Sequence, residues 1–387
     1  MPPAATMQAS PAGPAPRIWL APLRGVTLAP FRRLLAERFG GVDAALAPFA
    51  APGSAEKIPA RIFADAAASL GGPLPTVPQV IGRDPAALRA AGRVLRDLGF
   101  DRMDLNCGCP WKFVARKGRG SGLPEDPDAF ARMLEAGCET MPGGFSVKIR
   151  LGYRTPDTLA ARAELINSFP LRCVTVHPRT GVQMYDGAAD LDAFGAVLPL
   201  LRAPVVYNGD IDSPADAARI LDRFPSVAGI MVGRGLCSHP GLAAQIRGAP
   251  PPSREAVAAF ARDLAAEYAA SLCGPAPLLG RLKELWGYLH RSFEEGDEGK
   301  RKGRRSGDAP AALEENLGGA LLSRGRLPQY PRHWGPSLPC SEWERVLPPR
   351  HGHQGKDAED EIGPDNRAGN MAPKRSVGRK STSLTDD

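Results

Sequence analysis

Long apolar runs are missing from this sequence. No stretch of its 387 residues reaches the roughly 18 consecutive apolar residues that a membrane-spanning helix requires. Residues 1–16 are rich in alanine and proline but have neither a charged start nor an apolar centre, so they do not resemble a secretory signal. We therefore expect a soluble, cytoplasmic protein with a disordered leader at residues 1–16.

A disulfide framework is also missing. Cysteine occurs seven times, an odd number, without the spacing of paired cysteines, which is typical of reduced thiols in a cytoplasmic protein. Cys107 and Cys109 lie close together, but no second pair of Cys or His residues has zinc-ligand spacing, so we expect no metal site. The formal net charge of +7 is compatible with a polyanionic partner but does not identify one.

Short apolar runs alternate with helical patterns through most of the chain. Strands are expected at residues 18–22, 42–47, 77–81, 102–106, 145–150, 173–177, 204–208 and 228–232. Asp84, Asp126 and Ser213 each precede a proline, a pattern that marks the first turn of a helix. Eight strands alternating with helices predict an α/β fold, a (β/α)8 TIM barrel over residues 17–248.

Polar residues follow the predicted strands where each strand ends. Asn106, Lys148, His177, residues 208–210 and residues 233–234 all take such positions. Because active sites of (β/α)8 barrels assemble at the carboxyl ends of the strands, we expect these residues to form one site.

The chain changes character after the barrel. Prolines at 250–252 precede two helical patterns, at residues 255–272 and 277–293, which predict a small helical domain over residues 254–294. Residues 295–387 have few periodic apolar positions and are expected to be a disordered tail. An altered reading frame would produce the same abrupt end of the second helix, and this alternative remains open.

Seven motifs in register resemble the tRNA-dihydrouridine synthase family. They are APLRGVT (residues 21–27), PQV (78–80), LNCGCP (105–110), VKIR (147–150), VHPRT (176–180), YNGD (207–210) and VGRG (232–235). The resemblance covers residues 17–293. Residues 106–110 and 281–283 are most similar to the bacterial subfamily that acts near position 16 of the tRNA D-loop.

The resemblance implies an FMN-dependent enzyme that uses NADPH to reduce the C5=C6 bond of a uridine in tRNA. It implies that Cys109 is the general acid, because the hydride must be matched by a proton on the other carbon. The implied cofactor-binding residues are Pro22, Leu23, Arg24, Gln79, Lys148, His177, Asn208, Gly209, Asp210, Gly233 and Arg234. The implied substrate-binding residues are Asn106, Arg150, Arg179 and Lys283. We expect tRNA as the partner, a monomer, and no membrane association.

Several alternatives remain open at this stage. Lys148 could be a buried lysine paired with a carboxylate such as Asp104 instead of a flavin ligand. Leu23 and Arg24 replace residues that are more frequent in the family, and the helical domain is short. A flavin barrel that acts on a small molecule, or a non-catalytic tRNA-binding protein of the same fold, would share parts of the pattern.

Overall fold

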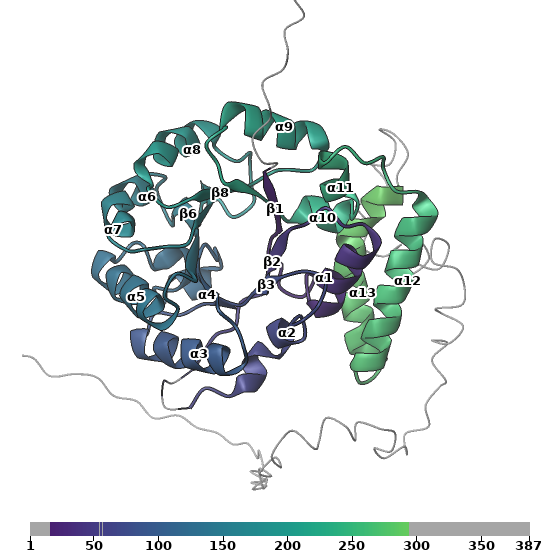
Figure 1. The fold of residues 1–387 in the computed structure, drawn as a ribbon, viewed down its shortest axis with the longest axis horizontal. Coiled ribbons are helices and arrows are strands. Elements are labelled where there is room, and N and C mark those ends of the chain that lie inside the picture. Colours follow the sequence, from purple (N-terminus) through teal and green to yellow (C-terminus); the bar gives the residue numbers. More distant parts are fainter. Residues whose placement is uncertain (1–15, 54, 56, 294–387) are drawn as a thin grey trace, which may run out of the picture. The chain divides into compact units, whose positions relative to one another are not determined.

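The computed structural model describes residues 16–53, 55 and 57–293. The predicted tail at residues 295–387 and nearly all of the predicted leader lie outside the described residues. The described chain forms a ring of parallel strands surrounded by helices (Figure 1). No helix in this part of the chain combines the length and apolar character needed to span a membrane.

The strands form one parallel sheet in the order β3-β2-β1-β9-β8-β7-β6-β5-β4. They are β1 (Arg17–Leu20), β2 (Ala44–Leu46), β3 (Thr76–Val77), β4 (Gln79–Val80), β5 (Met103–Cys107), β6 (Phe145–Gly152), β7 (Val174–Thr180), β8 (Val205–Asn208) and β9 (Gly229–Val232). All eight predicted strands are present, and the third is divided into β3 and β4.

Pro78 divides this third strand without opening the barrel. Proline has no backbone N–H, so it interrupts the ladder. The carbonyl of Val77 still accepts a hydrogen bond from Ala47 N (2.9 Å), and the carbonyl of Pro78 accepts one from Asp104 N (2.9 Å). One segment therefore bonds to both neighbours and closes the ring, which confirms the predicted (β/α)8 barrel.

Helices cover the outside of the ring (Figure 1). The helices up to the end of the barrel are α1 (Ala29–Arg38), α2 (Ala64–Ala67), α3 (Pro85–Asp97), α4 (Lys112–Ala115), α5 (Pro127–Thr140), α6 (Thr158–Ala161), α7 (Ala163–Asn167), α8 (Leu191–Val197), α9 (Pro214–Arg223), α10 (Arg234–Ser238) and α11 (Leu242–Ile246). The predicted helix starts are confirmed: the side chains of Asp84, Asp126 and Ser213 accept hydrogen bonds from backbone N–H groups in the first turns of α3, α5 and α9.

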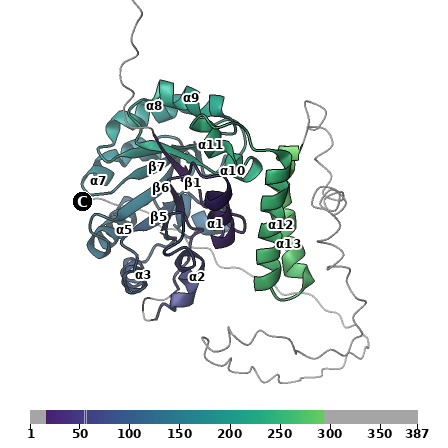
Figure 2. The ribbon, with the colours of Figure 1, turned by 45° about the vertical axis from the view of Figure 1, so that its right-hand side comes forward.

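Two helices follow the barrel, α12 (Arg254–Ser271) and α13 (Pro275–Leu289), and Figure 2 shows them side by side along the ring. Phe260 of α12 packs edge-to-face against Phe31 (5.5 Å between centroids) and Phe39 (5.4 Å). Arg33 of α1 pairs with Glu267 at 2.6 Å. A 3-10 turn, η4 (His290–Phe293), replaces the expected last turn of α13.

Successive side chains of a strand point alternately outward, toward the helices, and inward, into the barrel. In β1, Ile18 and Leu20 join the core between strands and helices, whereas Trp19 joins a smaller cluster that fills part of the barrel interior. In β5 to β7 the inward positions are instead polar: Asp104, Asn106, Ser146, Lys148, Arg150, Thr175, His177 and Arg179 alternate with buried apolar residues. This polar half of the interior positions the candidate site.

Candidate active site

A cavity of about 560 Å³ lies at the carboxyl ends of the strands. Its lining includes most of the residues predicted from the sequence: Pro22, Leu23, Arg24, Asn106, Cys109, Lys148, Arg150, His177, Asn208, Gly209, Asp210, Gly233 and Arg234. Three predicted residues, Gln79, Arg179 and Lys283, are not part of the lining. The volume falls within the range of about 300 to 1,000 Å³ that is typical of sites for small molecules and cofactors.

A chain of hydrogen bonds leads from the barrel interior to Cys109. Asn106 Oδ1 accepts from the backbone N–H groups of Gly108 (3.1 Å) and Cys109 (2.8 Å). Asn106 Nδ2 donates to Gln79 Oε1 (2.8 Å), and Gln79 Nε2 donates to Asp104 Oδ2 (2.7 Å). An ionised carboxylate can only accept, so Asp104 fixes which way both amides point. We call Asp104, Gln79 and Asn106 the amide relay.

The amide relay is almost completely shielded from solvent. Asp104 and Gln79 are each 1% exposed. Burial raises the pKa of Asp104 to about 6, although hydrogen bonds from Gln79 and Ser146 and the charge of Lys148 oppose the increase. Gln79 thus lies beneath the cavity with both ends of its amide bonded to protein groups.

Cys109 is half-buried at the cavity, in a tightly packed turn. Its carbonyl accepts hydrogen bonds from Ser121 N (3.1 Å) and Ser121 Oγ (2.9 Å). Gly120 has φ +56°, and a Cβ there would lie 2.9 Å from Cys109 Cβ. Burial raises the pKa of the Cys109 thiol, against the opposing effects of the Trp111 N–H, Arg150 and Arg24. The thiol is therefore protonated at neutral pH. Cys107 is fully buried, in keeping with its interpretation as a structural residue.

Lys148 projects into the cavity from β6. Burial lowers its pKa to about 8; the Arg150 charge acts in the same direction and Asp104 opposes it. Within the described part of the chain, Lys148 makes no ion pair, and the Asp104 oxygens bond instead to Gln79 and Ser146. The ammonium group is therefore available to a negatively charged group in the cavity.

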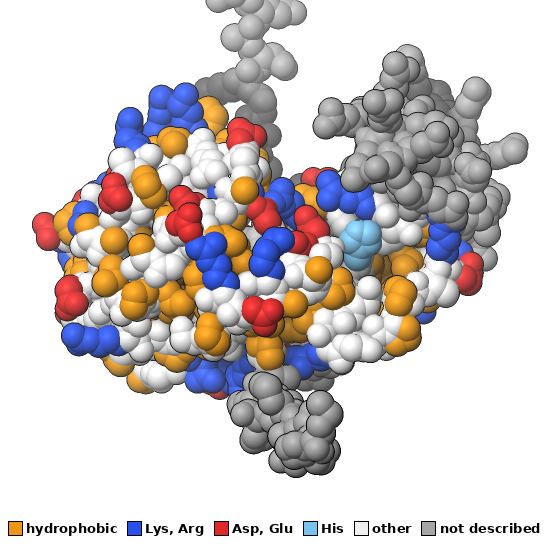
Figure 3. Space-filling view, turned by 90° about the horizontal axis from the view of Figure 1, so that it is seen from above, with side chains coloured by type: hydrophobic (Ala, Val, Ile, Leu, Met, Phe, Trp, Pro, Cys, Tyr) orange, Lys and Arg blue, Asp and Glu red, His pale blue; other side chains and the backbone are white. Residues whose placement is uncertain are grey.

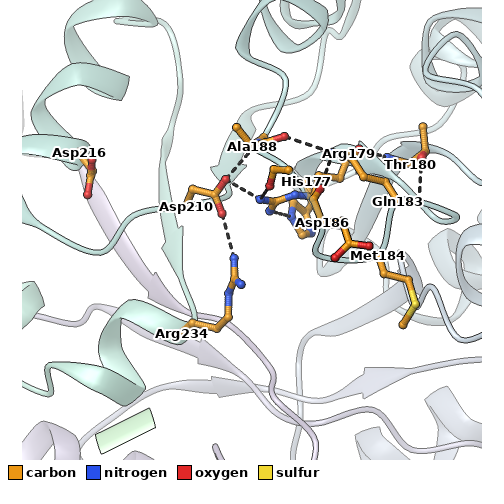
Figure 4. Close-up of polar contacts among 12 residues, drawn as sticks. His177, Arg179, Thr180, Gln183, Met184, Asp186, Ala188, Asp210, Asp216 and Arg234 are labelled. Atoms are coloured by element: carbon orange, nitrogen blue, oxygen red, sulfur yellow. Dashed lines mark hydrogen bonds and ion pairs between the residues drawn. The ribbon is translucent and has the colours of Figure 1, made fainter. Parts of the chain in front are cut away.

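A second network connects His177, Arg179, Asp210 and Arg234 (Figure 4). Arg179 Nη1 lies 3.1 Å from His177 Nε2, and Arg179 Nη2 donates to Asp210 Oδ2 (2.6 Å). Arg234 Nη2 donates to Asp210 Oδ1 (2.9 Å). Asp210 has φ +37°, an unusual conformation for a residue other than glycine, and the two guanidinium groups hold it there.

His177 is neutral in this network. Burial lowers its pKa well below 6.5, and the charges of Lys148, Arg150, Arg179 and Arg234 lower it further. A guanidinium group can only donate, so Nε2 accepts from Arg179 and the ring proton lies on Nδ1. Arg179 is 2% exposed and therefore orients His177 and Asp210 from behind the cavity wall.

Arg150 holds two loops at the cavity. Its Nε donates to Gly108 O (2.9 Å), next to Cys109, and its Nη1 donates to Thr180 O (2.8 Å) and Met184 O (2.6 Å). The ring of Tyr185 lies 5.3 Å from the Arg150 guanidinium carbon.

Sequence reasoning missed two tyrosines that line the cavity, Tyr185 and Tyr288. Tyr185 follows β7, and its position in a loop at the carboxyl end of a strand was an available signal. Tyr288 comes from α13, where no local pattern distinguishes it from its neighbours. On the same helix, Lys283 is exposed and lies outside the cavity, whereas the Arg281 guanidinium donates to the carbonyl of Gly25.

The profile described as "Dihydrouridine synthase (Dus)" matches residues 19–270. The chain is 38% identical over 240 residues to a probable tRNA-dihydrouridine synthase of Rhodobacter capsulatus, covering 60% of this chain and 72% of that protein. It is 35% identical over 272 residues to tRNA-dihydrouridine synthase B of Xanthomonas campestris pv. campestris, covering 66% and 77%. Among solved structures it is similar to an old yellow enzyme homologue from Zymomonas mobilis (TM-score 0.47, 15% identity, 62% of this chain, 90% of that chain).

Proposed function

Because this chain belongs to the dihydrouridine synthase family, we propose that it reduces the C5=C6 bond of a D-loop uridine in tRNA to 5,6-dihydrouridine. We propose FMN as its cofactor, NADPH as its electron donor and Cys109 as its general acid, in a protein that acts as a monomer. The observation that carries the proposal is the position of Cys109 in the lining of a cavity rich in cations and N–H donors, where burial raises the pKa of its thiol.

The lining of the cavity fits FMN. Lys148, Arg150 and Arg234 line it, and Arg234 and the buried Arg179 already neutralise the nearby carboxylate of Asp210. This excess of positive charge suits a phosphate group and the electron-rich edge of a flavin. Gly233 passes close to the segment that follows β1, since a Cβ there would lie 3.2 Å from the Leu23 side chain.

The residues that would hold FMN form two groups, one for its phosphate and one for its ring. Asn208, Gly209, Gly233 and Arg234 would hold the phosphate, and Lys148 and neutral His177 would contact the flavin ring. Bound FMN would supply the hydride for one carbon of the uridine double bond, after NADPH has reduced it.

Cys109 would donate the proton to the other carbon. A thiol can act as an acid only while it is protonated, and burial keeps it so. Arg150 and Asn106 hold the peptide unit between Gly108 and Cys109, on the amino side of the thiol. Asn106 Oδ1 already accepts two hydrogen bonds and one Nδ2 hydrogen is used by Gln79, so one N–H of Asn106 is left to orient the uracil ring.

For the target position we propose uridine 16. The similarity of residues 106–110 and 281–283 to the subfamily that acts near this position supports it. The relative from Xanthomonas campestris carries the name tRNA-dihydrouridine synthase B, which supports another subfamily. Mapping the product by position distinguishes the two.

The test is an incubation of the purified protein with NADPH and unmodified tRNA, followed by mapping of dihydrouridine. Cys109→Ala should abolish the product, whereas Cys138→Ala, which removes a half-buried thiol of α5, should not. A yellow protein that oxidises NADPH without changing tRNA would contradict the proposal and indicate a small-molecule oxidoreductase. A colourless protein that binds tRNA would indicate a non-catalytic binding protein.

A further inference from the structure

Exposed aromatic side chains and cations meet on the segment that follows Cys109. Trp111 is 57% exposed and Phe113 is 80% exposed. Four exposed cations accompany them: Lys112, Arg116, Lys117 and Arg119. We call these six residues the basic aromatic rim. Residues 111–119 contain no Asp or Glu.

The basic aromatic rim is fixed to the turn that contains Cys109. The backbone N–H of Trp111 bonds to the Cys109 side chain, and the Trp111 side chain lines the cavity. The carbonyl of Trp111 accepts from Val114 N (2.8 Å) and Ala115 N (2.9 Å), which forms the single turn of α4. Gly122 packs against this turn, because a Cβ there would lie 2.1 Å from the carbonyl oxygen of Ala115. The backbone that carries the two aromatic side chains therefore has a defined place relative to the thiol.

The rim has no partner within the described residues. None of its four cations makes an ion pair or a side-chain hydrogen bond there, in contrast to Arg33, Arg83 and Arg89, which all pair with carboxylates. On the face shown in Figure 3, basic, acidic and hydrophobic side chains are interspersed. The rim combines positive charge with exposed aromatic rings, the combination that binds single-stranded nucleic acid through phosphates and bases.

We propose that Trp111 and Phe113 stack on unpaired bases of the tRNA D-loop next to the target uridine, while the four cations contact the phosphates beside them. The inference rests on the proposed function, because a uridine must leave its stack to reach the cavity. The bases next to this uridine then lose a stacking partner, and an aromatic side chain at the cavity edge takes the place of the uridine.

Phe113 provides the cleaner test, because it does not line the cavity. Phe113→Ala removes the ring, and Phe113→Leu keeps an apolar side chain without aromatic stacking. Leu200→Ala is the matched control: Leu200 is 43% exposed in η3 (Leu198–Leu200), which leads to the amino end of β8, away from the cavity. Phe113→Trp should preserve stacking.

Stacking of one base on an aromatic side chain corresponds to roughly a 5- to 150-fold effect on affinity. We expect Phe113→Ala and Phe113→Leu to weaken tRNA binding by at least about 5-fold and to raise KM more than they lower kcat. Both variants should leave the reduction of the flavin by NADPH unchanged. The effect of Phe113→Ala should disappear with a tRNA that carries an abasic nucleotide at the stacking position.

The outcomes separate this inference from the proposed function. If the wild-type protein forms dihydrouridine but both Phe113 variants bind tRNA like Leu200→Ala, the stacking proposal is wrong. If no uridine is reduced, the proposed function is wrong, and the affinities of the same variants for tRNA still decide the inference. An equal loss of affinity for intact and abasic tRNA would also overturn it.

Discussion

Replacement of Asp104 by asparagine should make the protein more stable and its rate of uridine reduction more sensitive to high pH. Asparagine can keep both hydrogen bonds of the carboxylate: its carbonyl oxygen accepts from Gln79, and its amide donates to Ser146 Oγ. What it removes is a buried negative charge at the base of the amide relay.

The magnitude follows from the pKa of Asp104. Folding raises this pKa from 3.8 to about 6, so the folded state binds the proton more tightly than the unfolded state does. The wild-type free energy of unfolding therefore falls as the pH rises from about 4 to about 6, by about 3 kcal/mol in total, since one pH unit corresponds to about 1.4 kcal/mol. Above pH 6, Asp104→Asn should be more stable by up to this amount, and below pH 4 the two proteins should be equally stable.

Denaturant unfolding at several pH values measures this difference, and other titrating groups cancel in the comparison. Asp101→Asn, at a side chain that is 85% exposed just before β5, is the control and should show no such pH dependence. The reasoning would be refuted if the difference in stability between Asp104→Asn and wild type were the same at pH 4 and pH 7. It would also be refuted if the variant lost stability relative to wild type between pH 4 and pH 7.

The same substitution should impair catalysis at high pH. Asp104 raises the pKa of Lys148, which burial and Arg150 lower to about 8. Without the carboxylate this pKa falls further, so Lys148 should lose its charge, and the rate of uridine reduction should decline, at a lower pH than in wild type. Profiles of rate against pH that superimpose for the two proteins would show that Asp104 does not act on Lys148.

Three further predictions concern individual residues. Cys109→Ser should lower the rate of uridine reduction by a factor of about 10² to 10⁴, the range for loss of a general acid, with unchanged flavin reduction in stopped-flow measurements. Gly120→Ala should destabilise the protein by more than about 1 kcal/mol in denaturant unfolding, because φ is +56° and a Cβ would lie 2.8 Å from the Cys109 carbonyl oxygen; a fully active, stable variant would contradict this. Arg32→Met should cost about 2 to 3 kcal/mol in the same assay, because the 1% exposed guanidinium bonds to Thr27 O, Asp65 and Ser69, and Asp65 is only partly shielded.

The barrel could be predicted because its signals are local. Each strand is a short segment of apolar residues, successive or alternating with polar ones, and each of the caps at Asp84, Asp126 and Ser213 needs only the next few residues. The division of the third strand at Pro78 could not be predicted in the same way. An isolated proline in an apolar run does not show that the residues around it bond to strands on both sides.

The composition of the site was predictable only in part. Residues at strand ends reach the cavity because strand geometry places them there. Gln79 and Arg179 lie below or behind it because they bond to Asp104, Asn106, His177 and Asp210, and a sequence does not reveal which partner a side chain chooses. Tyr288 depends on how α13 docks against the barrel, a tertiary contact between distant segments.

Because α13 contributes to the cavity, the cavity is completed late in the synthesis of the chain. The first wall of the cavity, at residues 21–24, leaves the ribosome early, whereas Tyr288 follows more than 250 residues later. Until α12 emerges, Phe31 of α1 lacks its cover from Phe260, and until α13 emerges, Gly25 lacks its contact with Arg281. A nascent chain that ends before α12 therefore has an incomplete cavity and an exposed apolar surface, and the lining of the cavity is complete only after residue 288 has been added.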